Sequence, residues 1–330
     1  MPMIDDEPIK GRFFKVFTLK HGKKEVDGAK VLAVVEPLDE KNMKIFWKML
    51  SRGFMPIGRM SYMTYPKYID TPGQRSSKQK NLLNPRFQDI MKTFVGWFHF
   101  ADEPEEYLDP KVPRIMLPNS DTEWAVIDKV LGDKYVLPKL EEKIYDVMIQ
   151  IPDTNSTQDN IWIEEYKNWN LAVKCMEQII EKTNLTIFLS GKKIPSHLNY
   201  TDRIHWEPYF DKFYQFANFF DKVKVVLITA TSDASPRIIT QALFLNATVV
   251  VNNNIIGGKH YINDQTGGIF QSENDVAEVL TRLLDKYNKQ QIDPRSWYQE
   301  FQKDKNNRIQ SFIWMLREQN WYDYDDYEFT

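Results

Sequence analysis

One polar segment, residues 229–270, holds the residue types and spacings that chemistry on a phosphorylated ligand requires. It reads TATSDASPRIITQALFLNATVVVNNNIIGGKHYINDQTGGIF: a strand, a polar loop, a helix that starts near Pro236, a second strand, and a loop opened by Gly257 and Gly258. Backbone N–H groups at a helix start, together with the helix dipole, favour a bound diphosphate. A glycine pair lets the backbone approach a ligand closely. The segment therefore predicts a phosphate-binding edge, and the alternative is that the same residues form only a helix cap and a turn.

This segment resembles the donor-nucleotide half of GT-B glycosyltransferases of the family-4 type. Their pattern is roughly E-G-x-P-R-x-x-x-E-A, a strand, a glycine pair and a D-x-T-G-x-[LF] turn. Here SDASPRIITQAL, GGKHYI and NDQTGGIF stand in the same order. EYKNWNLAVKCMEQII is similar to the family's helix that begins with a phosphate-facing lysine, which is Lys167 in this sequence. The resemblance covers about residues 145–287, and it covers the N-terminal half only through overall architecture.

The resemblance implies a set of site residues in the C-terminal half. Asp233 stands at the first of the family's two carboxylate positions and is expected to act in catalysis. Gln241 stands at the second position, where it can hydrogen-bond a ribose hydroxyl but carries no charge. The residues implied to bind the donor nucleotide and its phosphates are Lys167, Ser235, Pro236, Arg237, Gln241, Gly257, Gly258 and Lys259.

Two sites in the N-terminal half follow from the same comparison. His99 ends the apolar run KTFVGWFHF, and related transferases often have a histidine near the cleft after such a strand, contacting the sugar. His99 is therefore expected to be catalytic, and the alternative is a core or rim histidine whose ring is already hydrogen-bonded. His21 and Gly22 follow the predicted first strand FFKVFTLK and are expected to form the acceptor-side loop.

The apolar pattern around these residues predicts an α/β fold. YDVMIQ, LTIFLS, VKVVLITA and ATVVVN are apolar runs of strand length, and helical patterns separate them. Nearly continuous apolar strands alternating with helices indicate parallel sheets that are buried on both faces. The N-terminal half shows the same class, with expected strands at 29–38, 55–63 and 92–100 and a helix at 42–54.

The expected architecture is GT-B-like, with two Rossmann-like domains whose parallel sheets face each other across a cleft. Residues 1–140 form the expected acceptor-side domain, and residues 141–295 form the nucleotide-sugar-binding domain. Residues 296–330 are expected to be a C-terminal helix that crosses back, followed by an acidic tail.

The implied reaction is sugar transfer from a UDP- or GDP-linked donor to a glycan or other hydroxyl acceptor, with retention of configuration. A metal-independent enzyme must stabilise the departing diphosphate with fixed donors and a cation, and Lys167 and the loops at 232–237 and 256–259 are the candidates. Loss of both family glutamates favours a different class, a non-catalytic relative that binds a nucleotide or glycan. Another nucleotide-sugar enzyme such as an epimerase is disfavoured, because no G-x-G-x-x-G occurs.

Composition excludes several other classes. The 330 residues carry 43 Lys+Arg and 46 Asp+Glu, a net charge of −3 that excludes a strongly basic nucleic-acid binder. No apolar run approaches the roughly 20 residues of a membrane span, and the acidic start is not a secretory signal, so a cytoplasmic location is expected.

The single Cys175 and five scattered histidines predict no metal site, and no cofactor besides the nucleotide sugar is expected. The D-x-D at Asp323 and Asp325 is interpreted as part of a solvated acidic tail.

Overall fold

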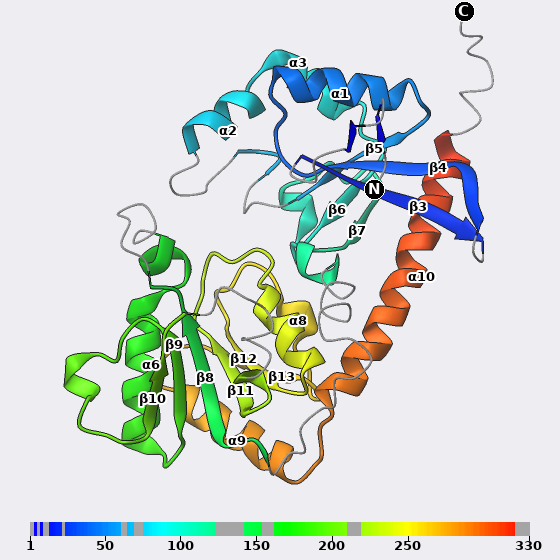
Figure 1. The fold of residues 1–330 in the computed structure, drawn as a ribbon. Helices are drawn as coiled ribbons and strands as arrows, with labels where there is room; N and C mark the ends of the chain where they lie inside the picture. Colours follow the sequence, from blue (N-terminus) through cyan, green and yellow to red (C-terminus); the bar gives the residue numbers. More distant parts are fainter. Residues whose placement is uncertain are drawn as a thin grey trace, which may run out of the picture. The chain divides into compact units, whose positions relative to one another are not determined.

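The computed structural model describes residues 3–4, 7–8, 13–21, 24–60, 65–68, 75–122, 142–153, 162–209 and 219–320. The chain forms two compact units (Figure 1). Unit 1 comprises Met1–Pro118 and Lys303–Thr330, and unit 2 comprises Asn119–Gln302. The 27-residue helix α10, Pro294–Asn320, contributes residues to both units. Gly22 and the acidic tail from residue 321 onward lie outside the described residues.

Unit 2 is built on a six-stranded sheet in which every pair of neighbouring strands is parallel. The spatial order is β10-β9-β8-β11-β12-β13, which is 3-2-1-4-5-6 when β8 counts as the first strand. This is the doubly wound Rossmann order, and its direction of winding reverses between β8 and β11. The strands are β8 Tyr145–Ile151, β9 Ile187–Gly191, β10 Ile204–Glu207, β11 Val223–Ile228, β12 Thr248–Asn252 and β13 Gly267–Phe270.

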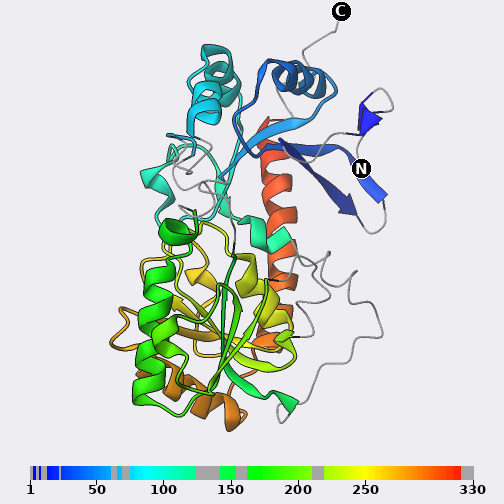
Figure 2. The same ribbon diagram turned by 60° about the vertical axis from the view of Figure 1, so that its left-hand side comes forward.

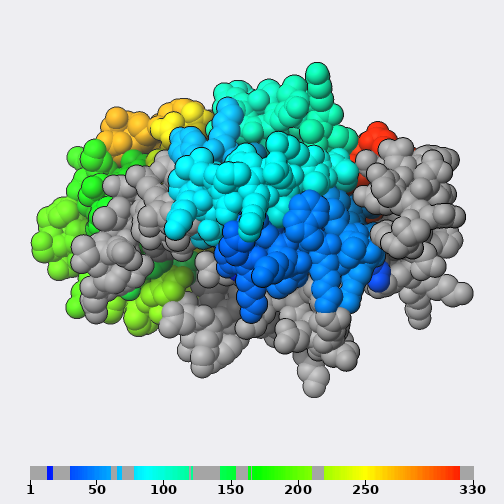
Figure 3. All heavy atoms as spheres, turned by 90° about the horizontal axis from the view of Figure 1, so that it is seen from above, coloured from blue at the N-terminus to red at the C-terminus, as the bar shows by residue number. Residues whose placement is uncertain are grey.

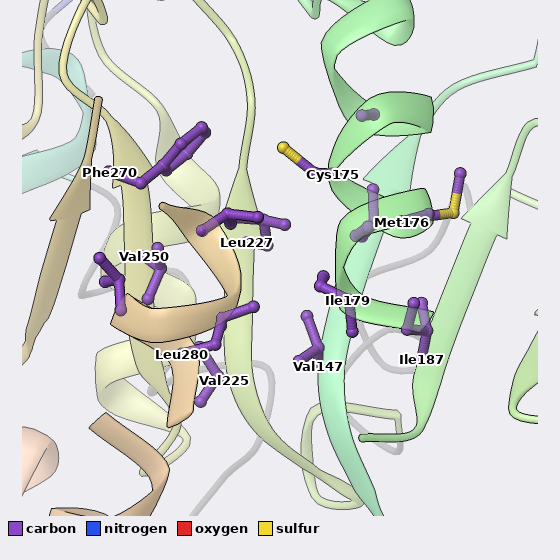
Figure 4. Packing of buried hydrophobic residues seen from close by; sticks show 14 of the residues in the cluster. Val147, Cys175, Met176, Ile179, Ile187, Val225, Leu227, Val250, Phe270 and Leu280 are labelled. Carbon is purple, nitrogen blue, oxygen red and sulfur yellow. The ribbon is translucent and has the colours of Figure 1, made fainter. Parts of the chain in front are cut away.

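Helices bury both faces of this sheet, which explains why its strands are apolar at nearly every position. On one face, α6 (Trp169–Lys182) and α9 (Val276–Asn288) contribute to a core cluster that includes Val147 and Ile149 of β8. Figure 4 shows Cys175 and Ile179 of α6 among the strand residues of this cluster. On the other face, α8 (Arg237–Phe244) and Tyr298 of α10 pack on a cluster that includes Met148. Figure 2 shows α6 running along the sheet as the long green helix.

Unit 1 holds a five-stranded sheet in the order β3-β4-β5-β6-β7. The sheet was expected to be parallel, but β3 is antiparallel to β4, because the two strands form a hairpin in which Phe14 pairs with Val34. The other neighbours are parallel. The strands are β3 Phe14–His21, β4 Lys24–Val34, β5 Met55–Arg59, β6 Trp97–His99 and β7 Arg114–Met116, and a short hairpin of β1 Met3–Ile4 and β2 Glu7–Pro8 precedes them.

Helices also cover both faces of this smaller sheet. Phe312 and Leu316 of α10 pack on one face, where Gly96 leaves room for them. On the other side, Phe46 of α1 (Glu40–Leu50) contacts Phe94, which in turn contacts Trp97 of β6. Figure 3 shows α1 in blue and residues 78–92 in cyan along one face of unit 1. Among the described residues, no helix has both the length and the apolar character that crossing a bilayer would require.

Local capping explains where the elements of unit 1 differ from expectation. Residues 92–100 were expected to be a strand, but α3 (Pro85–Lys92) extends to Lys92 and β6 begins only at Trp97. Asn84 starts α3 by accepting a hydrogen bond from the Arg86 N–H at 3.0 Å, and Pro85 supplies the first helical residue. A further helix, α2 (Arg75–Leu82), precedes α3.

The unit boundary also differs from the expected position near residue 140. It lies between Pro118 and Asn119, because the short 3₁₀ helix η2 (Asn119–Thr122) is bonded to unit 2. The Ser120 N–H donates to the Ser235 hydroxyl at 2.8 Å. At the C-terminal end, the division within α10 falls at residue 302, where the expected boundary was residue 295.

Candidate functional site

The carboxyl ends of β8 and β11 define the candidate site of unit 2. In a doubly wound sheet, the loops that follow the two strands at the reversal point separate and leave a crevice for a ligand. The chain after β8 leads through η4 (Trp162–Tyr166), a short π-helical segment, to Lys167. The chain after β11 leads to Asp233. The sequence therefore brings a cation and a carboxylate, far apart along the chain, to one edge of the sheet.

Lys167 and Asp233 form an ion pair at this edge. Lys167 Nζ lies 2.6 Å from Asp233 Oδ2, and the two side chains are 21% and 9% exposed. The Tyr166 hydroxyl donates to Asp233 Oδ1 at 3.2 Å. Burial, and secondarily the Asp233 charge, raise the pKa of the Tyr166 phenol, so that the phenol remains a proton donor at neutral pH. The Asp233 carboxylate is thus held by groups on the loop that follows β8.

Backbone hydrogen bonds fix these two loops to each other. The Thr231 N–H donates to the Tyr166 carbonyl at 3.3 Å, and the Thr229 hydroxyl donates to the Lys167 carbonyl at 3.0 Å. Immediately after Lys167, Asn168 adopts a left-handed conformation with φ of 56° and caps α6 through the Leu171 N–H. Lys167 therefore lies beside the N-terminus of α6, where the helix dipole disfavours a cation and favours an anion.

The loop after β12 packs against the loop after β11 through backbone contacts. The Gly257 N–H donates to the Asp233 carbonyl at 3.1 Å, and the Ile256 N–H donates to the Thr231 carbonyl at 3.1 Å. A Cβ on Gly257 would lie 2.0 Å from the Ala234 carbonyl oxygen, so this approach requires glycine.

This packing changes the role expected for two amides. The N–H groups of Ser235 and Gly257 were expected to grip a diphosphate, but both already donate to Asp233, that of Ser235 to Oδ1 at 3.2 Å. In this conformation the two amides build the loop that carries the carboxylate.

The other predicted donor-site residues lie on the same side of unit 2. Pro236 precedes α8, and no side chain caps that helix. Gly258 has φ of +94° and lies against Pro236 and Ile239 at the start of α8. Arg237 is exposed, and Gln241 is half-buried one turn further along the helix. The Lys259 Nζ donates to the Asn253 carbonyl at 3.5 Å.

The predicted site residues of unit 1 are described within that unit. His99 ends β6, is 7% exposed, and its Nδ1 lies 3.0 Å from the Ala101 carbonyl, which makes Nδ1 the protonated nitrogen. Burial lowers the pKa of His99, which favours the neutral imidazole. His21 is the last residue of β3, and its side chain is outside the described part of the chain.

Sequence reasoning missed four residues that hold the site. Tyr166 adjoins Lys167 in the sequence, and this adjacency was the only available signal for it. Ser120, Asp121 and Tyr261 are completely buried and are bonded to one another or to Ser235. Their partners are more than 100 residues away along the chain, so no local pattern indicates them. Within the described ranges, no group of three or more His, Cys, Asp or Glu residues is arranged to hold a metal ion.

Comparison with solved structures agrees with this architecture. HepE of Anabaena, in complex with UDP and glucose, superposes with a TM-score of 0.51 at 10% identity over 84% of this chain and 78% of its own. A chain of the GtfA/B complex gives 0.51 at 11% identity, over 87% of this chain and 57% of that one. TarM gives 0.50 at 11% identity, over 86% and 54%. This chain therefore spans little more than half the length of the latter two proteins.

The structural neighbours are GT-B glycosyltransferases, and the expected GT-B-like α/β fold is confirmed. No protein-family model matches the sequence. No curated protein matches it either.

Proposed function

We propose that this chain is a glycosyltransferase of the family-4 type that moves a sugar from a UDP- or GDP-linked donor to a glycan or other hydroxyl acceptor. The observation that carries the proposal is the Lys167–Asp233 pair at the reversal point of a 3-2-1-4-5-6 sheet. The GT-B fold and the UDP and glucose held by the HepE structure support a nucleotide-sugar donor.

The charges around Lys167 suit a departing diphosphate. During transfer, the bond between the anomeric carbon and the phosphate oxygen breaks, and its electron pair stays on that oxygen. The acceptor hydroxyl oxygen forms the new bond to the anomeric carbon, and its proton passes to the departing phosphate oxygen. The negative charge of a phosphate beside Lys167 would be stabilised both by the Lys167 ammonium group and by the N-terminus of α6. Asp233 would keep its bonds from Tyr166 and from the Ser235 N–H when Lys167 turns to the phosphate. We therefore propose a metal-independent reaction with Lys167 as the leaving-group cation and Asp233 as a catalytic residue that faces the sugar.

The remaining assignments complete the proposal. The first turn of α8 from Pro236 to Arg237, with Gly258 and Lys259, would contact the phosphates, and Gln241 would bond the ribose. His99 would contact the sugar through Nε2, because Nδ1 is directed to Ala101. His21 and Gly22 would lie on the acceptor side, and retention of configuration is proposed by analogy with the family-4 type.

A panel of UDP- and GDP-sugars, with release of UDP or GDP as the readout, tests this function. We expect Lys167→Met to reduce kcat/KM by about 10- to 100-fold, the range for loss of one charge-assisted hydrogen bond. The matched control is Lys174→Met on the exposed side of α6, where Lys174 pairs with Glu273 at 3.4 Å. No nucleotide release from any donor by the parent protein would overturn the enzymatic assignment.

Two observations favour a second candidate, a non-catalytic nucleotide- or glycan-binding protein. Gln241 replaces the second carboxylate, and Lys167 is already neutralised by Asp233. This candidate predicts that UDP or GDP binds while no donor in the panel is hydrolysed or transferred.

A further inference from the structure

A chain of hydrogen bonds connects η2 to both loops of the candidate donor site. The Ser120 N–H donates to the Ser235 hydroxyl at 2.8 Å, and the Ser235 hydroxyl donates to Ser120 Oγ at 3.0 Å. Ser120 Oγ lies 2.8 Å from the Tyr261 hydroxyl, which donates to Asp121 Oδ1. Ser235 belongs to the loop after β11, and Tyr261 belongs to η6 (Lys259–Tyr261), which directly follows the glycine pair.

The direction of each bond follows from the proton inventory. An ionised carboxylate only accepts, so the Tyr261 proton is used on Asp121, and the Ser120 hydroxyl must donate its own proton to the Tyr261 oxygen. Burial and the nearby Asp121 charge raise the pKa of Tyr261, which keeps the phenol protonated. The chain therefore runs in one direction, from Ser235 to the carboxylate, and every hydroxyl proton in it has an acceptor.

Because the residues of this chain are buried, the loss of one of these hydrogen bonds is costly. Ser120, Asp121 and Tyr261 are all 0% exposed, so water cannot replace a lost partner. The preceding residues of the same segment are fixed as well. The completely buried Arg59 side chain donates through Nη2 to the Pro118 carbonyl at 2.9 Å and to the Leu117 carbonyl at 3.5 Å.

We infer that Ser120 and Asp121 are positioning residues that set the two donor-site loops relative to each other, an inference that rests on the proposed function. Asp121 acts through Tyr261 on the loop after β12, and Ser120 acts on Ser235 in the loop after β11. The segment that joins the two units thereby determines the shape of the nucleotide-binding edge.

Hydrogen exchange of the protein without nucleotide tests the positioning directly. Tyr261→Phe removes the hydroxyl that Asp121 and Ser120 share, and Ser120→Ala removes one hydroxyl from the same chain. We expect both variants to raise exchange in peptides 231–237 and 256–262 by about fivefold, the factor that corresponds to one lost hydrogen bond. The matched control is Tyr287→Phe, which removes a buried phenol hydroxyl bonded to the Asn246 carbonyl at 2.6 Å. The control is expected to leave both peptides unchanged.

Donor kinetics give the second readout. We expect Ser120→Ala and Asp121→Asn to raise the donor KM by about fivefold while kcat changes less than twofold, because they alter the loops and not the reacting groups. Unchanged exchange in either loop, or an equal rise across all of unit 2, would overturn the inference. If the parent protein binds neither UDP nor GDP, the proposed function fails, and the exchange data alone decide whether η2 positions the two loops.

Discussion

Lys167 and Asp233 lie 66 residues apart in the sequence, yet their charged atoms are 2.6 Å apart at the carboxyl edge of the unit 2 sheet. Neither loop makes this contact by itself, since one follows β8 and the other follows β11. The contact combines a cation beside a helix N-terminus with a carboxylate that also accepts a hydrogen bond from a phenol.

A double-mutant cycle on this pair measures how strongly the two side chains are coupled. Lys167→Met leaves the 9%-exposed Asp233 carboxylate without its cation, and Asp233→Asn removes the charge that the cation neutralises. We expect a coupling energy of about 1–3 kcal/mol in the free energy of unfolding, below that of a completely buried pair because Lys167 remains partly exposed. Urea denaturation of the parent, both single variants and the double variant supplies the four values.

A pair on the surface gives the comparison for this cycle. Asp285 of α9 and Lys289, the residue that follows this helix, lie 2.8 Å apart with both side chains more than half exposed, and such pairs contribute at most about 0.5 kcal/mol. Equal coupling in the two cycles would show that the Lys167–Asp233 contact is an ordinary surface pair.

Gly257→Ala tests the backbone packing that supports the site. The added Cβ would meet the Ala234 carbonyl oxygen at 2.0 Å, and a backbone atom cannot move aside as a flexible side chain can. We expect a loss of about 3 kcal/mol in the free energy of unfolding, the upper part of the range for overpacking. Gly53→Ala is the control, because Gly53 has φ of +79° but nothing within 4 Å of the added Cβ. That variant should lose about 1–2 kcal/mol from backbone strain alone, and equal losses would contradict the packing argument.

The buried His99 predicts acid sensitivity. Burial lowers its pKa in the folded protein below the ordinary value of 6.5. Below pH 6.5 the unfolded chain therefore binds a proton that the folded chain does not, and the free energy of unfolding decreases as the pH falls. We expect His99→Gln to remove this part of the decrease in urea denaturation curves between pH 7 and pH 5. Parallel pH profiles for the two proteins would contradict the prediction.

The buried Lys143 predicts that the free energy of unfolding changes at alkaline pH. Its Nζ donates to the carbonyls of Phe220, Val223 and Leu245, which favours the charged form, but desolvation dominates and lowers its pKa from 10.5 to about 7. Between pH 7 and 10.5 the unfolded chain binds the additional proton. The free energy of unfolding should therefore rise with pH, by at most about 1.4 kcal/mol per pH unit from this group.

The measurement for Lys143 is the slope of stability against pH. Lys143→Met should flatten the slope between pH 7.5 and 9.5, whereas Lys222→Met, at an exposed position nearby, should keep it. An unchanged slope in Lys143→Met would show that the three carbonyl acceptors outweigh burial.

The sequence predicts the fold of unit 2 well because its signal is local. Continuous apolar runs at 145–150, 223–230 and 247–252 coincide with β8, β11 and β12, since parallel strands covered on both faces have no polar side. β10 was not predicted from the sequence, because IHWE is short and His205 and Glu207 lie outside the buried core. β3 was expected to belong to a parallel sheet, and periodicity does not reveal strand direction.

Only those residues of the candidate site that belong to a local sequence motif can be predicted from the sequence. The segment around Ser235 and Gly257 was found through its polar loop and glycine pair, and the structure does bring these loops together. The sequence does not show which acceptor each hydrogen-bond donor of these loops contacts. The Gly257 amide bonds Asp233, and Ser235 bonds Ser120 across 115 residues. Such partners arise from tertiary packing, which leaves no local pattern.

Isothermal titration of the parent protein and Lys167→Met with UDP and GDP tests the central claim most directly. We predict that the parent binds at least one of the two nucleotides and that Lys167→Met weakens this binding by at least tenfold, with Lys174→Met unchanged. Equal affinity of the parent and Lys167→Met, or no binding of either nucleotide by the parent, would contradict a diphosphate site at the Lys167–Asp233 pair.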